Sequence, residues 1–167
     1  MIKLIISTIG ALFLFQSNAI AQEMVELPKD CTTIELDMIK CPLEVSMDDA
    51  ADSMRLRANL LNFKLVAHMP LSEEVKSMGG ESPRIEIFQF CDALIASKMV
   101  AQSLAFAGYL PCRIAMVEGK DGTDWLVTLN MDATIGAADL PEELKVMGMK
   151  VRNNIYSIVQ AGVVGDF

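Results

Sequence analysis

The stretch from Arg84 to Glu118 constrains the fold most, because it combines a strand, a helix and a second strand. β-Branched and aromatic residues in Ile85–Phe90 predict the first strand. Asp92 is a suitable N-cap for the helix that follows, whose apolar residues recur at mostly three- and four-residue steps up to Gly108. Ile114–Val117 then predicts the second strand.

Two cysteines mark the ends of this unit. Cys91 ends the first strand and Cys112 begins the second. If the two strands are antiparallel neighbours, the end of one lies beside the start of the other. A hairpin partner predicted over 124–131 would bring its last residues to the same edge. We therefore expect one candidate ligand or redox site here, formed by Cys91, Asp92, Cys112, Asn130 and Met131.

The segments FCDALIASKM and AGYLPCRIAMVEGKDG resemble the domain of unknown function 302 family. Its members carry a Cys-Asn-Pro segment after a strand and an LPC-type turn into the next strand. Cys91 and Cys112 match both cysteines, whereas Asp92-Ala93 stands in place of Asn-Pro; weaker similarity covers 43–132. The resemblance implies an α+β fold with helices on one face of a curved antiparallel sheet. It implies no activity, because the family has no agreed one.

The remaining patterns complete a β-α-β(4)-α-like domain with about four to five strands. Ser46 is a good N-cap for an amphipathic helix. Gly162 is expected to end the last helix. The other elements that we predict are a helix over 46–61, a strand over 63–69, a helical turn over 72–78, a small-residue linker over 133–139 and a final helix over 140–160.

Residues Met1–Ala21 have the form of a secretory signal peptide, with Lys3, an apolar core and an Ala19-Ile20-Ala21 cleavage site. The apolar run is too short to span a membrane comfortably. We therefore expect export to the periplasm and cleavage after Ala21. The expected organisation is a signal peptide (1–21), an N-terminal extension (22–42) and a single α+β domain (43–167).

Composition and net charge argue against some classes of binding partner. The 146 residues left after cleavage fit one domain, which buries roughly 70% of its unfolded surface and needs no disulfide to fold. The mature charge is about −9 and the pI about 4.6, which argues against nucleic acid and against an anionic membrane surface. No later segment has eighteen uninterrupted apolar residues, so no membrane association is expected after cleavage.

Four cysteines allow three pairings. An oxidising periplasm makes a Cys31–Cys41 disulfide plausible, and sequence proximity favours it together with Cys91–Cys112. Loop entropy does not distinguish the pairings, because a Cys31–Cys41 bridge and a Cys91–Cys112 bridge would each stabilise the fold by about 3 kcal/mol. For Cys91 and Cys112 four alternatives stay open. They are a structural disulfide, a reactive dithiol beside a helix N-terminus, a soft-metal site completed by Met131, or a pair of buried free thiols.

Catalytic motifs are scarce. His68 is the only histidine, which excludes a multi-histidine metal site, and its place at a strand end is typical of an ordinary surface or half-buried residue. There is no P-loop and no dinucleotide fingerprint, so no cofactor is expected. The first hypothesis is a non-enzymatic periplasmic module that binds a small molecule or a protein. The alternative is thiol redox or copper handling at Cys91 and Cys112. A homodimer through an open sheet edge is a further expected partner.

Overall fold

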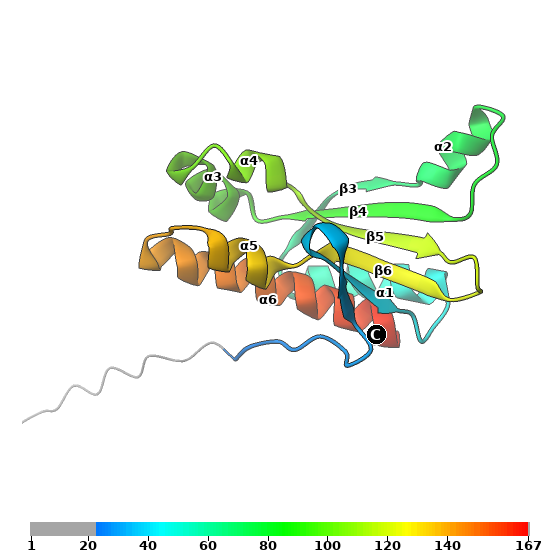
Figure 1. Cartoon of the computed structure of the whole chain (residues 1–167), viewed down its shortest axis with the longest axis horizontal. Helices are drawn as coiled ribbons and strands as arrows, with labels where there is room; N and C mark the ends of the chain where they lie inside the picture. Colours follow the sequence, from blue (N-terminus) through cyan, green and yellow to red (C-terminus); the bar gives the residue numbers. More distant parts are fainter. Residues whose placement is uncertain (1–22, 167) are drawn as a thin grey trace, which may run out of the picture.

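A six-stranded antiparallel sheet with helices packed on one face forms the fold (Figure 1). The computed structural model describes residues 23–166, so the predicted signal peptide and its cleavage site lie outside the described residues. The strands are β1 Thr32–Ile34, β2 Met38–Pro42, β3 Lys64–Met69, β4 Ile85–Cys91, β5 Cys112–Glu118 and β6 Asp124–Leu129. The helices are α1 Met47–Leu60, α2 Leu71–Ser77, α3 Ala93–Gln102, α4 Phe106–Tyr109, α5 Met131–Ala137 and α6 Glu142–Val164, with a 3₁₀ turn at Glu35–Asp37.

The predicted α+β class is confirmed, and the strand count is six instead of four to five. The order across the sheet is β1-β2-β6-β5-β4-β3. The segment expected to be an N-terminal extension supplies the two extra pairings, because β2 pairs with β6 and β1 with β2. The sheet is open and uncurled, where the prediction had a curved one. From β2 to α6 the chain still follows β-α-β(4)-α order, with α2 to α5 inserted in the connections.

Burial alternates along the strands and separates two faces of the sheet. In β4, Phe88 and Phe90 are fully buried, whereas Ile85 and Ile87 are half-buried. Successive strand residues point to opposite faces, so the buried set faces α1 and α6. The opposite face carries a half-buried, largely apolar set and has neither of these long helices over it (Figure 1).

Helices α1 and α6 pack against each other as well as against the sheet. The Ser46 hydroxyl accepts a hydrogen bond from the Asp49 backbone N–H, as predicted for the N-cap. The last helix runs past its predicted end to Val164 and stops at Gly165, which has a positive φ of 72°. Gly162 is therefore an interior helix residue. A Cβ there would lie 2.7 Å from the Met54 side chain, so this glycine permits close helix packing and ends nothing.

Two connections differ from the predictions. The helix after Asp92 stops at Ser103, whose extended backbone (φ −153°, ψ 129°) separates α3 from the short α4. The expected linker over 133–139 is mostly helical. Asn130 caps α5 by accepting from the Ala133 N–H at 3.1 Å. The cap and the alanines at 133 and 137 favour the helix, in spite of the poor helix formers Thr134 and Gly136.

Cys31 and Cys41 form a disulfide with an S–S distance of 2.02 Å, which joins the start of β1 to β2. Cys41 is buried on the helix-covered face. In the part of the chain from 23 to 166, none of the helices combines the length and the apolar character that crossing a membrane requires.

Candidate functional site

The ends of β4 and β5 bring Cys91 and Cys112 to one end of the sheet. Cys91 is the last residue of β4 and Cys112 the first of β5. The two strands are antiparallel neighbours, as the sequence predicts. Helices α3 and α4 connect them and lie beyond this end of the sheet, with α5 and the first turns of α6 below (Figure 1).

Cys91 and Cys112 are free thiols in the structure, which corresponds to one of the four alternatives that the sequence left open. The register supplies a reason. Cys112 lies opposite Phe90, and Cys91 lies opposite Lys64 on β3. Neighbouring residues in a strand point to opposite faces, so the two cysteines are offset instead of directly opposed. A disulfide requires Cβ atoms about 3.8 Å apart with converging directions, which an offset pair does not provide.

A cavity of about 470 Å³ lies at this end of the sheet, and we call it the sheet-end cavity. Both free cysteines line it. Residues from both faces of the sheet contribute, so the cavity continues around the strand ends onto the face without long helices. Most of its walls are apolar. They include Phe63, Ile87, Ile95, Met99, Ala115, Val127, Leu129, Met131, Ile135 and Val151.

The sequence-predicted site residues divide into two groups. Cys91, Asp92, Cys112 and Met131 all line the sheet-end cavity. Asn130 lies next to it but is not part of its walls, because its side chain caps α5. The carboxylate of Asp92 caps α3, accepting from the Leu94 and Ile95 N–H groups at 3.1 Å each.

Burial controls the ionisation of the two thiols. Desolvation, and to a lesser extent the nearby Cys91, raise the pKa of Cys112 from 9.0 to about 11. The pKa of Cys91 is also raised, by desolvation and by the charge of Asp92. Both thiols are therefore protonated at neutral pH. This opposes the expectation that the α3 N-terminus would activate Cys91, since thiolate character governs cysteine reactivity.

Several lining residues were missed by the sequence analysis, among them Arg113, Met99 and Thr134. Arg113 directly follows Cys112 and is the only arginine or lysine in the cavity walls. The sequence does show a cation next to a candidate cysteine, but the strand pattern alone does not show that the Arg113 side chain lines a cavity. Among residues 23–166, no three His, Cys, Asp or Glu side chains gather closely enough to hold a metal ion.

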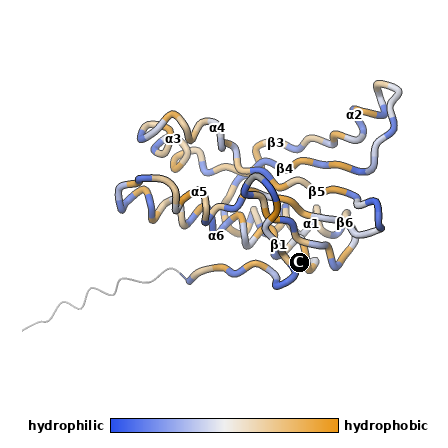
Figure 2. The backbone as a smooth tube through the Cα atoms, viewed as in Figure 1, coloured by the Kyte–Doolittle hydropathy of each residue, from blue (hydrophilic) through white to orange (hydrophobic). Residues whose placement is uncertain are grey.

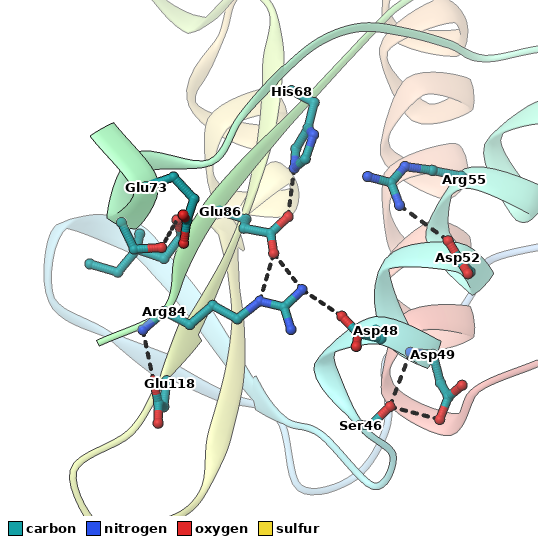
Figure 3. A network of polar contacts seen from close by, with 12 residues as sticks. Ser46, Asp48, Asp49, Asp52, Arg55, His68, Glu73, Arg84, Glu86 and Glu118 are labelled. Atoms are coloured by element: carbon teal, nitrogen blue, oxygen red, sulfur yellow. Dashed lines mark hydrogen bonds and ion pairs between the residues drawn. The ribbon is translucent and has the colours of Figure 1, made fainter. Parts of the chain in front are cut away.

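A polar network lies on the helix-covered face (Figure 3), and its residues Asp48, His68, Arg84 and Glu86 do not line the sheet-end cavity. His68 Nε2 is 2.6 Å from a carboxylate oxygen of Glu86, and Arg84 Nε donates to the other oxygen at 2.7 Å. Arg84 also reaches Asp48 at the start of α1 at 2.7 Å. The His68 ring stacks on Phe88 at 4.5 Å.

This network links β3, β4 and α1. Burial alone would raise the pKa of Glu86, but the hydrogen bonds from Arg84 and His68 outweigh it and hold the pKa below its ordinary value. The sequence signal for this network is Glu86, a charged residue that lies on the same face of β4 as the buried Phe88 and Phe90. No nucleophile contacts His68 within residues 23–166, so the arrangement is read as a structural ion-pair network.

The comparisons with known proteins agree on one family. The model of the domain of unknown function DUF302 matches residues 39–162. The crystal structure of an uncharacterized conserved DUF302 protein from Bacillus stearothermophilus has a TM-score of 0.63 and 14% identity, covering 75% of this chain and 98% of that one. At this identity the likeness shows the fold alone. No curated protein matches the chain significantly. The chain belongs to the DUF302 family.

Proposed function

We propose that this protein is an exported, non-enzymatic binding protein that holds a small, predominantly apolar molecule in the sheet-end cavity. The observation that carries the proposal is the cavity itself. Its volume of about 470 Å³ is within the roughly 300–1,000 Å³ of small-molecule sites, and its walls are mostly apolar with a few polar groups. The raised thiol pKa values support binding over thiol chemistry.

The test uses the mature chain and an apolar fluorescent probe, N-phenyl-1-naphthylamine, whose emission rises on transfer from water to an apolar site. Ala96 on α3 lines the cavity, and Ala96→Phe is expected to fill part of it. We expect this variant to weaken probe binding at least tenfold, because the added ring takes the place of the probe.

Ala93→Phe is the matched control. Ala93 lies on the same helix, is exposed and does not line the cavity, so this variant should bind the probe as the parent does. Circular dichroism checks that both variants fold. Equal probe affinity in Ala96→Phe, Ala93→Phe and the parent would exclude the cavity as the binding site.

Export to the periplasm is part of the proposal and rests on the composition of residues 1–21. Expression of the full chain in a bacterium, followed by osmotic release and intact mass measurement, tests it. The expected product begins at Gln22 and is released with the periplasmic fraction. A full-length product that stays in the cytoplasm contradicts it.

The second candidate function is thiol redox or soft-metal handling. The observation that favours it is that the free thiols of Cys91 and Cys112 line the same cavity as the thioethers of Met99 and Met131. Thiolates and thioethers are the ligands that Cu(I) prefers.

An anaerobic Cu(I) titration against a competing chelator tests this candidate. It predicts one tightly held Cu(I) per chain, lost in Cys112→Ser. Unchanged Cu(I) retention in Cys112→Ser, or no retention by the parent, rejects a metal role. A Cys91/Cys112 pair that forms no disulfide under mild oxidant, or one whose reduction potential is as low as that of structural disulfides, rejects a redox role.

A further inference from the structure

Arg113 differs from the other four arginines of the chain. Arg55 pairs with Asp52, Arg57 with Asp166, Arg84 with Asp48 and Glu86, and Arg152 with Asp132. The Arg113 side chain, by contrast, has no hydrogen bond or ion pair within residues 23–166, although it lines the sheet-end cavity.

The surroundings of Arg113 leave its guanidinium available to a ligand. The one acidic residue in the cavity walls is Asp92, and its carboxylate already accepts two N–H groups of α3. Across the sheet, Arg113 lies opposite Gln89 on β4, which is uncharged. On β3, Lys64 lies opposite Cys91, so a second cation is near the same end of the sheet. Arg113 and Lys64 therefore place two cations at this end, against the single wall carboxylate of Asp92, in a chain whose net charge is −8.

Most of the other cavity walls are apolar, and they extend away from Arg113. Arg113 belongs to the face without long helices, whereas Phe63, Met99, Ile135 and Val151 line the cavity on the helix-covered side. Figure 2 shows hydrophobic stretches along β4 and over the α3–α4 region. One end of the cavity thus offers a cation, and the other offers apolar walls.

We propose that the ligand is an amphiphilic monocarboxylate, such as a medium-chain alkanoate. Its carboxylate pairs with Arg113 and its alkyl chain occupies the apolar part of the sheet-end cavity. This rests on the proposed function and adds the class of ligand to it. The planar guanidinium fork matches a carboxylate in a bidentate manner. A single cavity-lining arginine suits a monoanion, because a dianion would meet the repulsion of the acidic chain.

The experiment compares alkanoates with alcohols of the same length, from six to twelve carbons. Binding is measured by displacement of the fluorescent probe from the mature protein. All ligand concentrations are kept below those at which micelles form. In both series we expect affinity to rise by about fourfold per added CH₂ until the cavity is filled, since each buried methylene is worth about 0.8 kcal/mol. At equal length the carboxylate is expected to bind about five- to tenfold tighter than the alcohol, and high salt reduces this margin.

Arg113→Gln should remove the margin between carboxylate and alcohol, because it weakens carboxylate binding much more than alcohol binding. Arg113→Lys should retain part of it, because the charge remains and the bidentate geometry is lost. Arg55→Gln is the control for a general change in charge, since Arg55 does not line the cavity, and it should keep the margin.

Two failures are distinguishable. Alcohols that bind as tightly as alkanoates, or a margin that survives Arg113→Gln, overturn the carboxylate inference and leave the proposed function standing. If neither series displaces the probe and Ala96→Phe does not affect probe binding, both the inference and the proposed function fail.

Discussion

Cys112 shows how burial decides the chemistry of a single residue. Its thiol ionises with a pKa of about 11, against an ordinary 9.0, mainly because the folded chain removes it from water. A thiol of this kind is a poor nucleophile at neutral pH. The same burial makes it a suitable wall for an apolar ligand.

This raised pKa predicts a loss of stability in alkali. Between about pH 9 and 11, Cys112 is ionised in the unfolded chain but stays protonated in the folded one, so the folded state binds more protons and the free energy of unfolding falls as pH rises. We expect a loss of the order of 2 kcal/mol from this residue. Urea unfolding at pH 8 and pH 10.5, without reductant, measures it.

Cys112→Ser removes the titrating group and should lose less stability over this pH range. The pKa of Tyr156 is also raised by burial, but it contributes equally to both proteins and cancels in the comparison. An identical pH dependence in parent and variant would contradict the prediction.

At the scale of elements, Glu86 ties the edge strand β3 to β4 and, through Arg84, to α1. The lowered pKa of Glu86 means that its contribution to stability is present above about pH 4.5 and is lost as pH falls through the folded-state pKa. We expect Glu86→Gln to reduce stability at pH 7 and to make acid unfolding less steep, as followed by circular dichroism between pH 7 and pH 2.

Glu73→Gln is a control for this prediction. Glu73 is an exposed carboxylate whose partner is Lys76 on the same helix, and exposed pairs contribute little. This variant should unfold in acid as the parent does. If it matches Glu86→Gln, the buried network does not govern the acid transition.

The contact of α6 with α1 and β6 depends on Gly162. A Cβ at this position would lie 2.7 Å from Met54 Cγ and 2.9 Å from Leu126 Cδ1. Overpacking of this kind costs about 1–3 kcal/mol, which exceeds the helix propensity gain of about 1 kcal/mol from alanine. We therefore expect Gly162→Ala to lower the free energy of unfolding measured in urea.

Gly148 in the same helix offers a matched comparison. A Cβ there would meet Ile135 at an ordinary 3.6 Å, so Gly148→Ala should gain up to about 1 kcal/mol from helix propensity. The prediction fails if the two alanine variants have the same stability.

At the scale of the whole molecule, we propose that a homodimer would use the sheet face opposite α1 and α6, in place of the open sheet edge that the sequence suggested. A half-buried apolar row crosses this face away from the cavity at Ile85, Val117, Trp125 and Pro42. A two-fold axis would bring this face against the same face of a second copy. The four strands that carry this row, about 4.8 Å apart and about 20 Å long, give a footprint of about 400 Å². A standard interface buries about 800 Å² per partner, so we expect a weak dimer.

Sedimentation equilibrium over a range of concentrations checks this expectation. Val117→Asp puts a charge in the middle of the apolar row and should shift the chain to monomer. Val146→Asp, at an exposed position on α6, should not. A parent chain that is monomeric at every concentration, or equal dimerisation in both variants, contradicts the prediction.

Local patterns were sufficient for much of the fold. Ser46 and Asp92 cap the helices that the sequence assigns to them, and the strands over 85–91 and 112–118 are antiparallel neighbours as expected. Cap and strand signals depend on a few adjacent residues, so they can be read from one chain. The same signals placed Cys91, Asp92, Cys112 and Met131 around one cavity.

Only the tertiary structure decided the features that depend on residues far apart in the chain. The segment over 133–137 continues as a helix, Gly162 lies inside α6, and Cys91 and Cys112 remain thiols because their strand positions are offset. The fold pairs the other four arginines with carboxylates, but within residues 23–166 it brings no acidic side chain into an ion pair with Arg113. The sequence by itself determined most of the strands and helices and the resemblance to the family. The packing of distant elements determined the cavity and what each side chain faces.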